Sequence, residues 1–510
     1  MLAPRWDRAS VAVVGGACAA KAGVHLALVD RYGYHGDELY FLECGRRLAF
    51  GYVDHPPLIP WLARAADALG GGLLVLRLPA IAAGVGTLWI TSLFVRALGG
   101  GWRAQLVALL SLLLAPAHLR MGAMLDIPVV EGFLCALVAW LVWRAAATGR
   151  TRTWVLAGLA LGAAGLAKHS SLAFGAALGL GMLLVEGRGL LRARGPWLGA
   201  GAALLVVAPN LAWQFTHGLP TLEFMGAMRR ELGAHQGPAL FLAGQLLYFH
   251  PLAVPVWGAG LVSALRGQRA ARPFAIAFLA LAAVYVATSG KPYYLASAYP
   301  PVLAAGAVAL ERWRERAVAG WRALVAALAV TGAGLGLVAL PALPLTTVDS
   351  VTGALFGWAV RPIDLTHDLH AMYGWREHAA AIDHALASLP EPERGDALVL
   401  AGTYSQAAAL NRLRRPGAPR AVSGHMTYHL WGPGRARAPV LVAYGVPLSI
   451  LERHYARCAE VGRVDAPLAR PHDTDLPIHA CREPLDELPA LWADVRRYRQ
   501  RWDPPGVAAR

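Results

Sequence analysis

The feature that most limits the fold of this 510-residue chain is a succession of long apolar segments. A helix that spans a membrane needs about 20 mainly apolar residues. About eleven segments approach that length, and ten to twelve are possible because the fifth is short and its end near residue 168 is ambiguous. The sequence therefore predicts a polytopic α-helical membrane protein. The segments are, roughly, 10–30, 73–97, 104–119, 124–146, 153–167, 170–187, 197–216, 238–262, 272–289, 292–310 and 320–342.

The composition agrees with a membrane protein. Only 15% of the residues are charged and 56% are apolar, whereas soluble globular proteins carry roughly 25% charged residues. The net charge of +15 would suggest nucleic acid in a soluble protein, but here the arginines gather between apolar segments, as in cytoplasmic membrane loops. We therefore expect no nucleic-acid partner, and we interpret the signal-peptide-like N-terminus as a retained first helix because many spans follow it.

The arginine clusters predict the orientation, since they precede the first segment and then follow every second one. The positive-inside rule places such loops, and with them the N-terminus, in the cytoplasm. With eleven spans, the loop 31–72, the loop 218–237 and the chain after 343 face outward. The clusters are Arg5 and Arg8; Arg96 and Arg103; Arg144, Arg150 and Arg152; Arg188, Arg192 and Arg194; Arg266, Arg269 and Arg272; and Arg312, Arg314 and Arg316.

The chain from 344 to 510 changes character and becomes polar and proline-rich. The runs "DALVLAG" and "PVLVAYGV" are typical of short buried strands, and "YSQAAALNRL" and "LSILERHYARCAEV" are typical of helices that follow them. We therefore expect a small extracytoplasmic α/β domain over 344–510, after a transmembrane catalytic domain over 1–343. Cys458 and Cys481 could form a disulfide if this domain lies outside the cytoplasm.

The first outward loop is rich in acids. It holds Asp37, Glu38, Asp54 and His55 beside apolar segments, and carboxylates at such a position usually mark a site. Asp37 and Glu38 would point about 100° apart on a helix, so one could act as a general base while the other orients or supports it. The run after Pro60 predicts an amphipathic helix on the membrane surface. The alternative interpretation is a solvated loop with a surface helix.

Lysine is rare, which makes its positions informative. Of 47 basic residues only Lys21, Lys168 and Lys291 are lysines, and the last two lie in short predicted outward loops, "GLAKHSS" and "SGKPYYLASAYPP". A compact ammonium with three donors suits a phosphate, although snorkelling at a helix end is the alternative. Asp126, in "LDIP", would begin the fourth span on the outer side. N-capping alone would explain it, but a pocket shared with Asp37 is geometrically possible.

The ordered set "DELY", "GYVDHPPLIPWL", "LDIP" and "GKPYYLASAYPPVLAAGA" resembles glycosyltransferase family 39. This GT-C-type membrane family includes protein O-mannosyltransferases and the lipid A aminoarabinose transferase. The similarity covers roughly 30–310, and "YGWREHAAAI" and "YHLWGPG" resemble the outer domain of bacterial members. The resemblance implies a hexosyl- or pentosyltransferase of the bacterial cytoplasmic membrane. Its donor would be a polyprenyl-phosphate sugar, and its acceptor a hydroxyl of a lipid, glycan or protein on the outer face.

The resemblance also implies roles for single residues. Asp37 would be the general base, Lys168 and Lys291 would lie near the phosphate, and Asp126 would be a second acid. A Glu-Lys pair of the aminoarabinose transferase is Asp-His here, which leaves phosphate contact at that point open, and a divalent metal remains a possibility. The full substrate-binding set implied is Glu38, Asp54, His55, Asp126, Lys168, Lys291 and Tyr294.

Two other classes of function are compatible with a polytopic chain. A transporter or flippase of lipid-linked sugars would show paired halves and charges near the bilayer midplane, whereas here the acids lie in one early loop. A catalytically silent relative would not need both Asp37 and Lys291. The enzyme is therefore the favoured interpretation.

Overall fold

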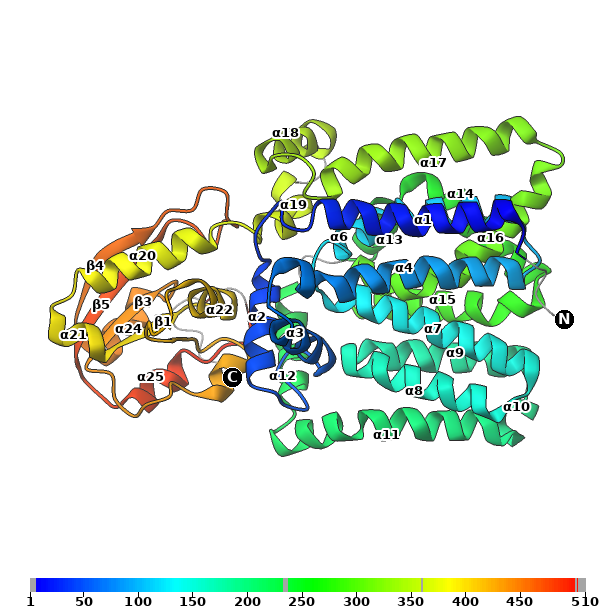
Figure 1. Cartoon of the computed structure of the whole chain (residues 1–510). Helices are drawn as coiled ribbons and strands as arrows, with labels where there is room; N and C mark the ends of the chain where they lie inside the picture. Colours follow the sequence, from blue (N-terminus) through cyan, green and yellow to red (C-terminus); the bar gives the residue numbers. More distant parts are fainter. Residues whose placement is uncertain (1–5, 233–236, 359–360, 500–501, 503–510) are drawn as a thin grey trace. The chain divides into compact units, whose positions relative to one another are not determined.

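The computed structural model of the chain describes residues 6–232, 237–358, 361–499 and 502. It consists of two compact units (Figure 1), which we call the helical unit and the α/β unit. The helical unit comprises 1–31, 55–216 and 232–344, and the α/β unit comprises 32–54, 217–231 and 345–510. The predicted outward loop 31–72 is therefore split between the two units. Residues 32–54 fold with the C-terminal residues in the α/β unit, and the residues from 55 onward belong to the helical unit. Arg5 of the first arginine cluster and part of the predicted loop 218–237 lie outside the described residues.

The helical unit consists of helices and short 3-10 turns that coincide with the predicted apolar segments. Each of those segments contains a helix, and the segment 238–262 contains two that meet at a bend. The elements are α1 (Arg8–Ala27), α3 (Leu58–Ala68), α4 (Leu73–Ala97), α5 (Trp102–Leu113), α6 (Pro116–Met121), α7 (Ile127–Thr148), α8 (Thr151–Ala167), α9 (Ser170–Glu186), α10 (Gly189–Arg192), α11 (Arg194–Thr216), α13 (Pro238–Tyr248), η1 (Pro251–Ala253), α14 (Val254–Arg266), η2 (Arg269–Ala271), α15 (Arg272–Ala287), η3 (Pro292–Ala298), α16 (Tyr299–Arg314) and α17 (Val318–Ala339).

Length and composition decide which of these helices could cross a membrane. Within the described residues seven stretches qualify: α1, α4, α7, α11, η2 with α15, η3 with α16, and α17. The pair α13 and η1–α14, bent by 92°, would be an eighth, and α5, α8 and α9 are shorter apolar helices. The prediction of a polytopic helical membrane protein is confirmed, and the number of eleven spans stays a prediction.

Small residues set the distances between the helices. A Cβ on Gly306 of α16 would lie 1.8 Å from the carbonyl oxygen of Val256 on α14, and one on Gly158 of α8 would lie 1.9 Å from that of Gly199 on α11. Glycine is the only residue that permits these approaches, and helices within membranes commonly associate through such small residues. Close backbone packing therefore holds α14 against α16 and α8 against α11.

The predicted amphipathic helix is α3. It packs Ile59, Ala63 and Ala66 against the rest of the helical unit, while Leu69 at its end is 76% exposed. Its position on the membrane surface stays a prediction.

The α/β unit has a five-stranded mixed sheet in the order β2-β1-β3-β5-β4. β1 pairs in parallel with β2 and β3, and β5 pairs antiparallel with β3 and β4. The strands are β1 (Ala397–Ala401), β2 (Ala421–Val422), β3 (Val440–Tyr444), β4 (Tyr455–Val464) and β5 (Leu476–Pro484). The helices are α2 (Gly36–Arg46), α12 (Pro220–Leu232), α18 (Leu345–Phe356), α19 (Pro362–His370), α20 (Trp375–Ala387), α21 (Glu391–Asp396), α22 (Tyr404–Leu413), α23 (Thr427–Trp431), α24 (Leu448–His454) and α25 (Leu488–Asp494).

The predicted small α/β domain is confirmed, with one error inside it. Both predicted strands are present as β1 and β3, and α22 covers the predicted run "YSQAAALNRL". The helix predicted over "LSILERHYARCAEV" is wrong after His454, because α24 ends there and β4 follows. Pairing of β4 with β5 overrides the helical periodicity, and a disulfide between the facing Cys458 and Cys481 joins the two strands.

Candidate active site

The N-terminus of α2 positions the first two predicted acids. The Asp37 N–H donates to Nδ1 of His35 (3.1 Å), and the Glu38 carboxylate accepts from the His35 N–H (2.9 Å), which forms a capping box. Burial lowers the pKa of His35 in spite of the nearby Asp37 charge, so the ring is neutral and can accept this bond. Glu38 is fully buried. Its contact with the His35 N–H is structural, and the contact with substrate that the resemblance implied stays a prediction.

Asp37 is held on one side and open on the other. The Tyr404 hydroxyl donates to Oδ1 (2.7 Å), Oδ2 lies 3.7 Å from His35 Nδ1, and the side chain is 35% exposed. Burial, and then the Asp37 charge, raise the pKa of Tyr404, so the phenol stays protonated and can donate. Gly36 permits this approach, since a Cβ there would lie 2.9 Å from Ser405 Oγ. A fixed, partly exposed carboxylate is what a general base requires.

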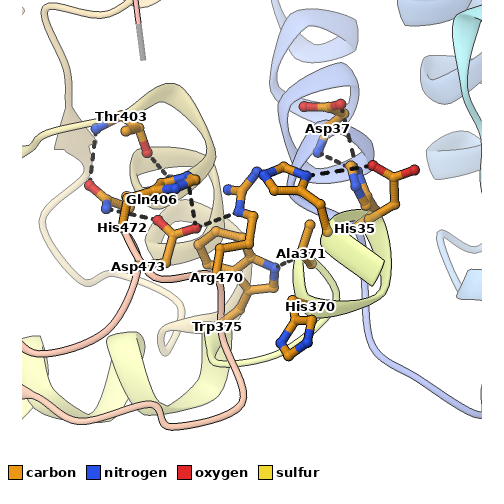
Figure 2. A network of polar contacts seen from close by, with 12 residues as sticks. His35, Asp37, His370, Ala371, Trp375, Thr403, Gln406, Arg470, His472 and Asp473 are labelled. Carbon is orange, nitrogen blue, oxygen red and sulfur yellow. Dashed lines mark hydrogen bonds and ion pairs between the residues drawn. The ribbon is translucent and has the colours of Figure 1, made fainter. Parts of the chain in front are cut away.

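A buried polar network fixes the N-terminus of α22, where Tyr404 lies (Figure 2). Thr403 caps the helix through a capping box with Gln406, and Gln406 Nε2 donates to Asp473 Oδ1 (3.0 Å). Arg470 Nε donates to the other oxygen of Asp473 (2.7 Å). Burial acts to raise the pKa of Asp473, but the neighbouring charges, Arg470 foremost, hold it below its ordinary value. The ionised pair therefore anchors the cap, and with it the donor to Asp37.

Asp54 lies in the same unit and is also held by a tyrosine. The Tyr40 hydroxyl donates to Asp54 Oδ1 (2.9 Å), and the N–H of Val53 donates to Thr427 Oγ1 (3.0 Å). Asp54 is half-buried. The α/β unit thus contains Asp37, Glu38 and Asp54, and of these Asp37 and Asp54 are partly exposed residues.

In the helical unit the structure brings three of the predicted residues together. Lys168 Nζ lies 3.8 Å from the centre of the Tyr294 ring, and Lys291 Nζ lies 5.9 Å from the Tyr293 ring, which Lys168 also faces at 5.4 Å. Lys168 Nζ is 3.5 Å from Glu131 Oε2. Two ammonium groups and one carboxylate around a tyrosine pair leave a net positive charge, which suits a phosphate.

Glu131 was not among the predicted site residues. It lies on α7 and accepts from the hydroxyls of Ser170 (2.7 Å) and Ser171 (3.3 Å) at the start of α9. The sequence did carry a signal, since a carboxylate within an apolar segment is rare and usually has a function. Glu131 helps to position Lys168, because the ammonium lies within 3.5 Å of the carboxylate as well as 3.8 Å from the centre of the Tyr294 ring.

The other two predicted residues of the helical unit have structural contacts. Asp126 caps α7 by accepting from the Ile127 N–H (2.7 Å), which is the alternative that the sequence left open. His55 is buried, with Nδ1 3.0 Å from the carbonyl oxygen of Pro56. Both have further contacts. The predicted pocket shared by Asp37 and Asp126 stays a prediction, since the two residues belong to different units.

A metal site was left open by the sequence. Over the part of the chain that the structure describes, no group of three or more His, Cys, Asp or Glu side chains is arranged to hold a metal ion.

Comparison with known proteins gives a family match for part of the chain and a shared fold for most of it. Residues 54–213 match the family described as dolichyl-phosphate-mannose-protein mannosyltransferase, and this range includes His55, Asp126 and Lys168. Most of the chain shares its fold with solved structures of ArnT. The predicted resemblance to GT-C-type membrane glycosyltransferases is therefore confirmed.

Two of the similar solved structures are of ArnT from Cupriavidus metallidurans. The form bound to undecaprenyl phosphate is 16% identical, with a TM-score of 0.59, over 92% of this chain and 98% of that chain. The apo form is 17% identical, with a TM-score of 0.59, over 92% and 97%. At such identities the likeness establishes the fold. No curated protein sequence matches the chain significantly.

Proposed function

We propose that this chain transfers a sugar from a polyprenyl-phosphate donor to an acceptor hydroxyl, with Asp37 as the general base. The observation that carries the proposal is the state of Asp37, a partly exposed carboxylate whose Oδ1 is fixed by Tyr404. The matching family is named for a dolichyl-phosphate sugar donor, and one similar structure holds undecaprenyl phosphate. Both support a polyprenyl-phosphate donor.

The proposed reaction is a single displacement. Asp37 removes the proton of the acceptor hydroxyl as its oxygen attacks the anomeric carbon. The bond from that carbon to the phosphate oxygen breaks, and its electron pair remains on the polyprenyl phosphate. Configuration at the anomeric carbon inverts.

The departing phosphate gains negative charge and needs a cation to stabilise it. Lys168 and Lys291 would supply this charge from the helical unit, with Tyr294 holding the Lys168 ammonium. A positive group that is already in place needs no reorganisation during the reaction, which is the main source of such stabilisation.

The same proposal assigns a location. The chain would be a multi-pass protein of the bacterial cytoplasmic membrane with a cytoplasmic N-terminus, and residues 344–510 would be extracytoplasmic. The Cys458–Cys481 disulfide supports an oxidising compartment for these residues, because disulfides rarely persist in the cytoplasm.

The function is tested by incubating membranes that contain the chain with radiolabelled sugars on polyprenyl phosphate, and in parallel with nucleotide sugars. We expect label to enter an acceptor fraction from the polyprenyl-phosphate donor alone. Movement of intact labelled donor across sealed vesicles without transfer would instead favour the flippase alternative. Transfer directly from a nucleotide sugar would contradict the proposed donor.

A Tyr404→Phe variant tests the support of Asp37. It removes one hydrogen bond to a charged group, worth about 1.5–3 kcal/mol, so we expect kcat to fall roughly tenfold to a hundredfold with little change in KM. The matched control is Tyr455→Phe, which removes the hydroxyl that donates to the Ala438 carbonyl oxygen elsewhere in the α/β unit. An equal loss of kcat in both variants would mean that general destabilisation, and not the bond to Asp37, explains the effect.

A further inference from the structure

The helical unit contains a cavity that the proposed reaction does not use. Its volume is about 740 Å³, and it lies where α4, α14 and α16 meet the loop after α14. Three arginines from the predicted cytoplasmic clusters line it, namely Arg266, Arg269 and Arg312. Ligand pockets commonly have volumes of about 300–1,000 Å³, so the cavity has the size of a small-molecule site.

Two of these arginines carry uncompensated charge. Among the described residues the guanidinium groups of Arg266 and Arg312 make no ion pair or hydrogen bond, and both side chains are exposed. No Asp or Glu is among the residues that line the cavity, and the carboxylate of the neighbouring Glu311 accepts from the Gly101 N–H (2.8 Å) at the start of α5. Arg269 donates to the carbonyl oxygen of Val185 (3.3 Å). The cavity therefore presents a net positive charge.

The framework of the cavity is held in place by short contacts. Gly260 and Gly306 let α14 and α16, which both line it, approach closely. Gln268 Nε2 donates to the Ala305 carbonyl oxygen of α16 (3.3 Å), which ties the loop after α14 to the neighbouring helix. The arginines thus extend from fixed backbone positions.

Apart from Ser263 and Gln268, the other side chains of the wall are apolar. They include Leu98, Ala259, Val262 and Ala309, and Val262 is 50% exposed. A free phosphate ion gains nothing from the apolar part of the wall, whereas the glycerol and the first methylenes of a phospholipid would be buried against it. Basic pockets between membrane helices on the cytoplasmic side are suited to anionic headgroups.

We propose that this cavity binds the phosphodiester headgroup of an anionic phospholipid. Arg266 and Arg312 contact the phosphate oxygens in charge-assisted hydrogen bonds, and the apolar wall holds the upper part of the acyl chains. The proposal does not depend on transferase activity.

The test is a calorimetric titration of the full chain in neutral detergent. The probes are short-chain phosphatidylglycerol, phosphatidylcholine of the same chain length, and inorganic phosphate. We expect phosphatidylglycerol to bind more tightly than either of the others. With about 1 kcal/mol for each arginine near the headgroup, the double variant R266Q/R312Q should bind it roughly thirtyfold more weakly.

The matched control is R150Q/R152Q, which removes two exposed arginines from another predicted cytoplasmic loop and should change binding by less than about twofold. Unfolding temperature without lipid checks that both variants are folded. An equal loss in the control would overturn the proposal by showing that only the general charge matters. Equal affinity for inorganic phosphate and phosphatidylglycerol would also overturn it, as would undiminished binding by R266Q/R312Q.

Discussion

An Asp37→Asn variant is expected to transfer sugar about a thousandfold more slowly than the wild type, because a positioned general base contributes roughly 10²–10⁴ to such a rate. Asparagine has nearly the same shape and can still accept from the Tyr404 hydroxyl, which now donates to Oδ1 (2.7 Å). What it lacks is the capacity to take a proton. The variant therefore removes the chemistry of the residue and leaves its packing in place.

The measurement is kcat for transfer from the polyprenyl-phosphate donor at equal amounts of folded protein, together with donor affinity, which should be unchanged. The control is Asp465→Asn, because Asp465 is an exposed carboxylate of the same unit. If Asp37→Asn kept the wild-type rate, Asp37 would have no part in the mechanism, and Asp126 would become the next candidate for the base.

The membrane helices could be predicted from the sequence because their signal is local. A run of apolar residues is sufficient to specify a helix in a bilayer, since only helices satisfy all their own backbone hydrogen bonds there. The prediction for 73–97 coincides with α4 (Leu73–Ala97). A bend within an apolar segment was harder to predict. The segment 238–262 is apolar throughout, although α13 and α14 meet there at 92°.

In the α/β unit the errors arise where tertiary pairing decides the conformation. The residues after His454 have an apolar spacing that suits a helix, but they form β4 because β5 offers a partner strand along its length. No local pattern shows that partner. The grouping of residues 32–54 with the C-terminal residues was missed for the same reason.

The sequence indicated which residues of the candidate site could carry charge or accept a proton, but not which residues hold them in place. The scarcity of lysine pointed to Lys168 and Lys291, and both lie beside tyrosines. Tyr404 carries no comparable signal, because it contacts Asp37 from a position 367 residues further along the chain. The sequence indicated N-capping for Asp126, which caps α7, but it did not show that Glu38 takes part in the capping box of α2.

A Lys168→Met variant is expected to lower kcat about a hundredfold or more, because removal of one preorganised group that stabilises developing negative charge typically costs 10²–10³. Methionine keeps much of the length and apolar contact of the lysine stem and removes its charge. The difficulty is that Lys168 also pairs with Glu131, at 3.5 Å, and Glu131 is buried. Loss of the lysine could therefore act by leaving a buried carboxylate without its cation.

The double variant K168M/E131Q separates the two explanations. Glutamine keeps an oxygen to accept from Ser170 and Ser171, which now donate to Glu131, and it removes the unpaired charge. If Lys168 stabilises the departing phosphate, the double variant will regain thermal stability, but its kcat will remain about a hundredfold below that of the wild type. Stability and kcat would then respond differently to the second substitution. Recovery of kcat together with stability would show that Lys168 serves only to neutralise Glu131, and the phosphate would then have to be bound elsewhere.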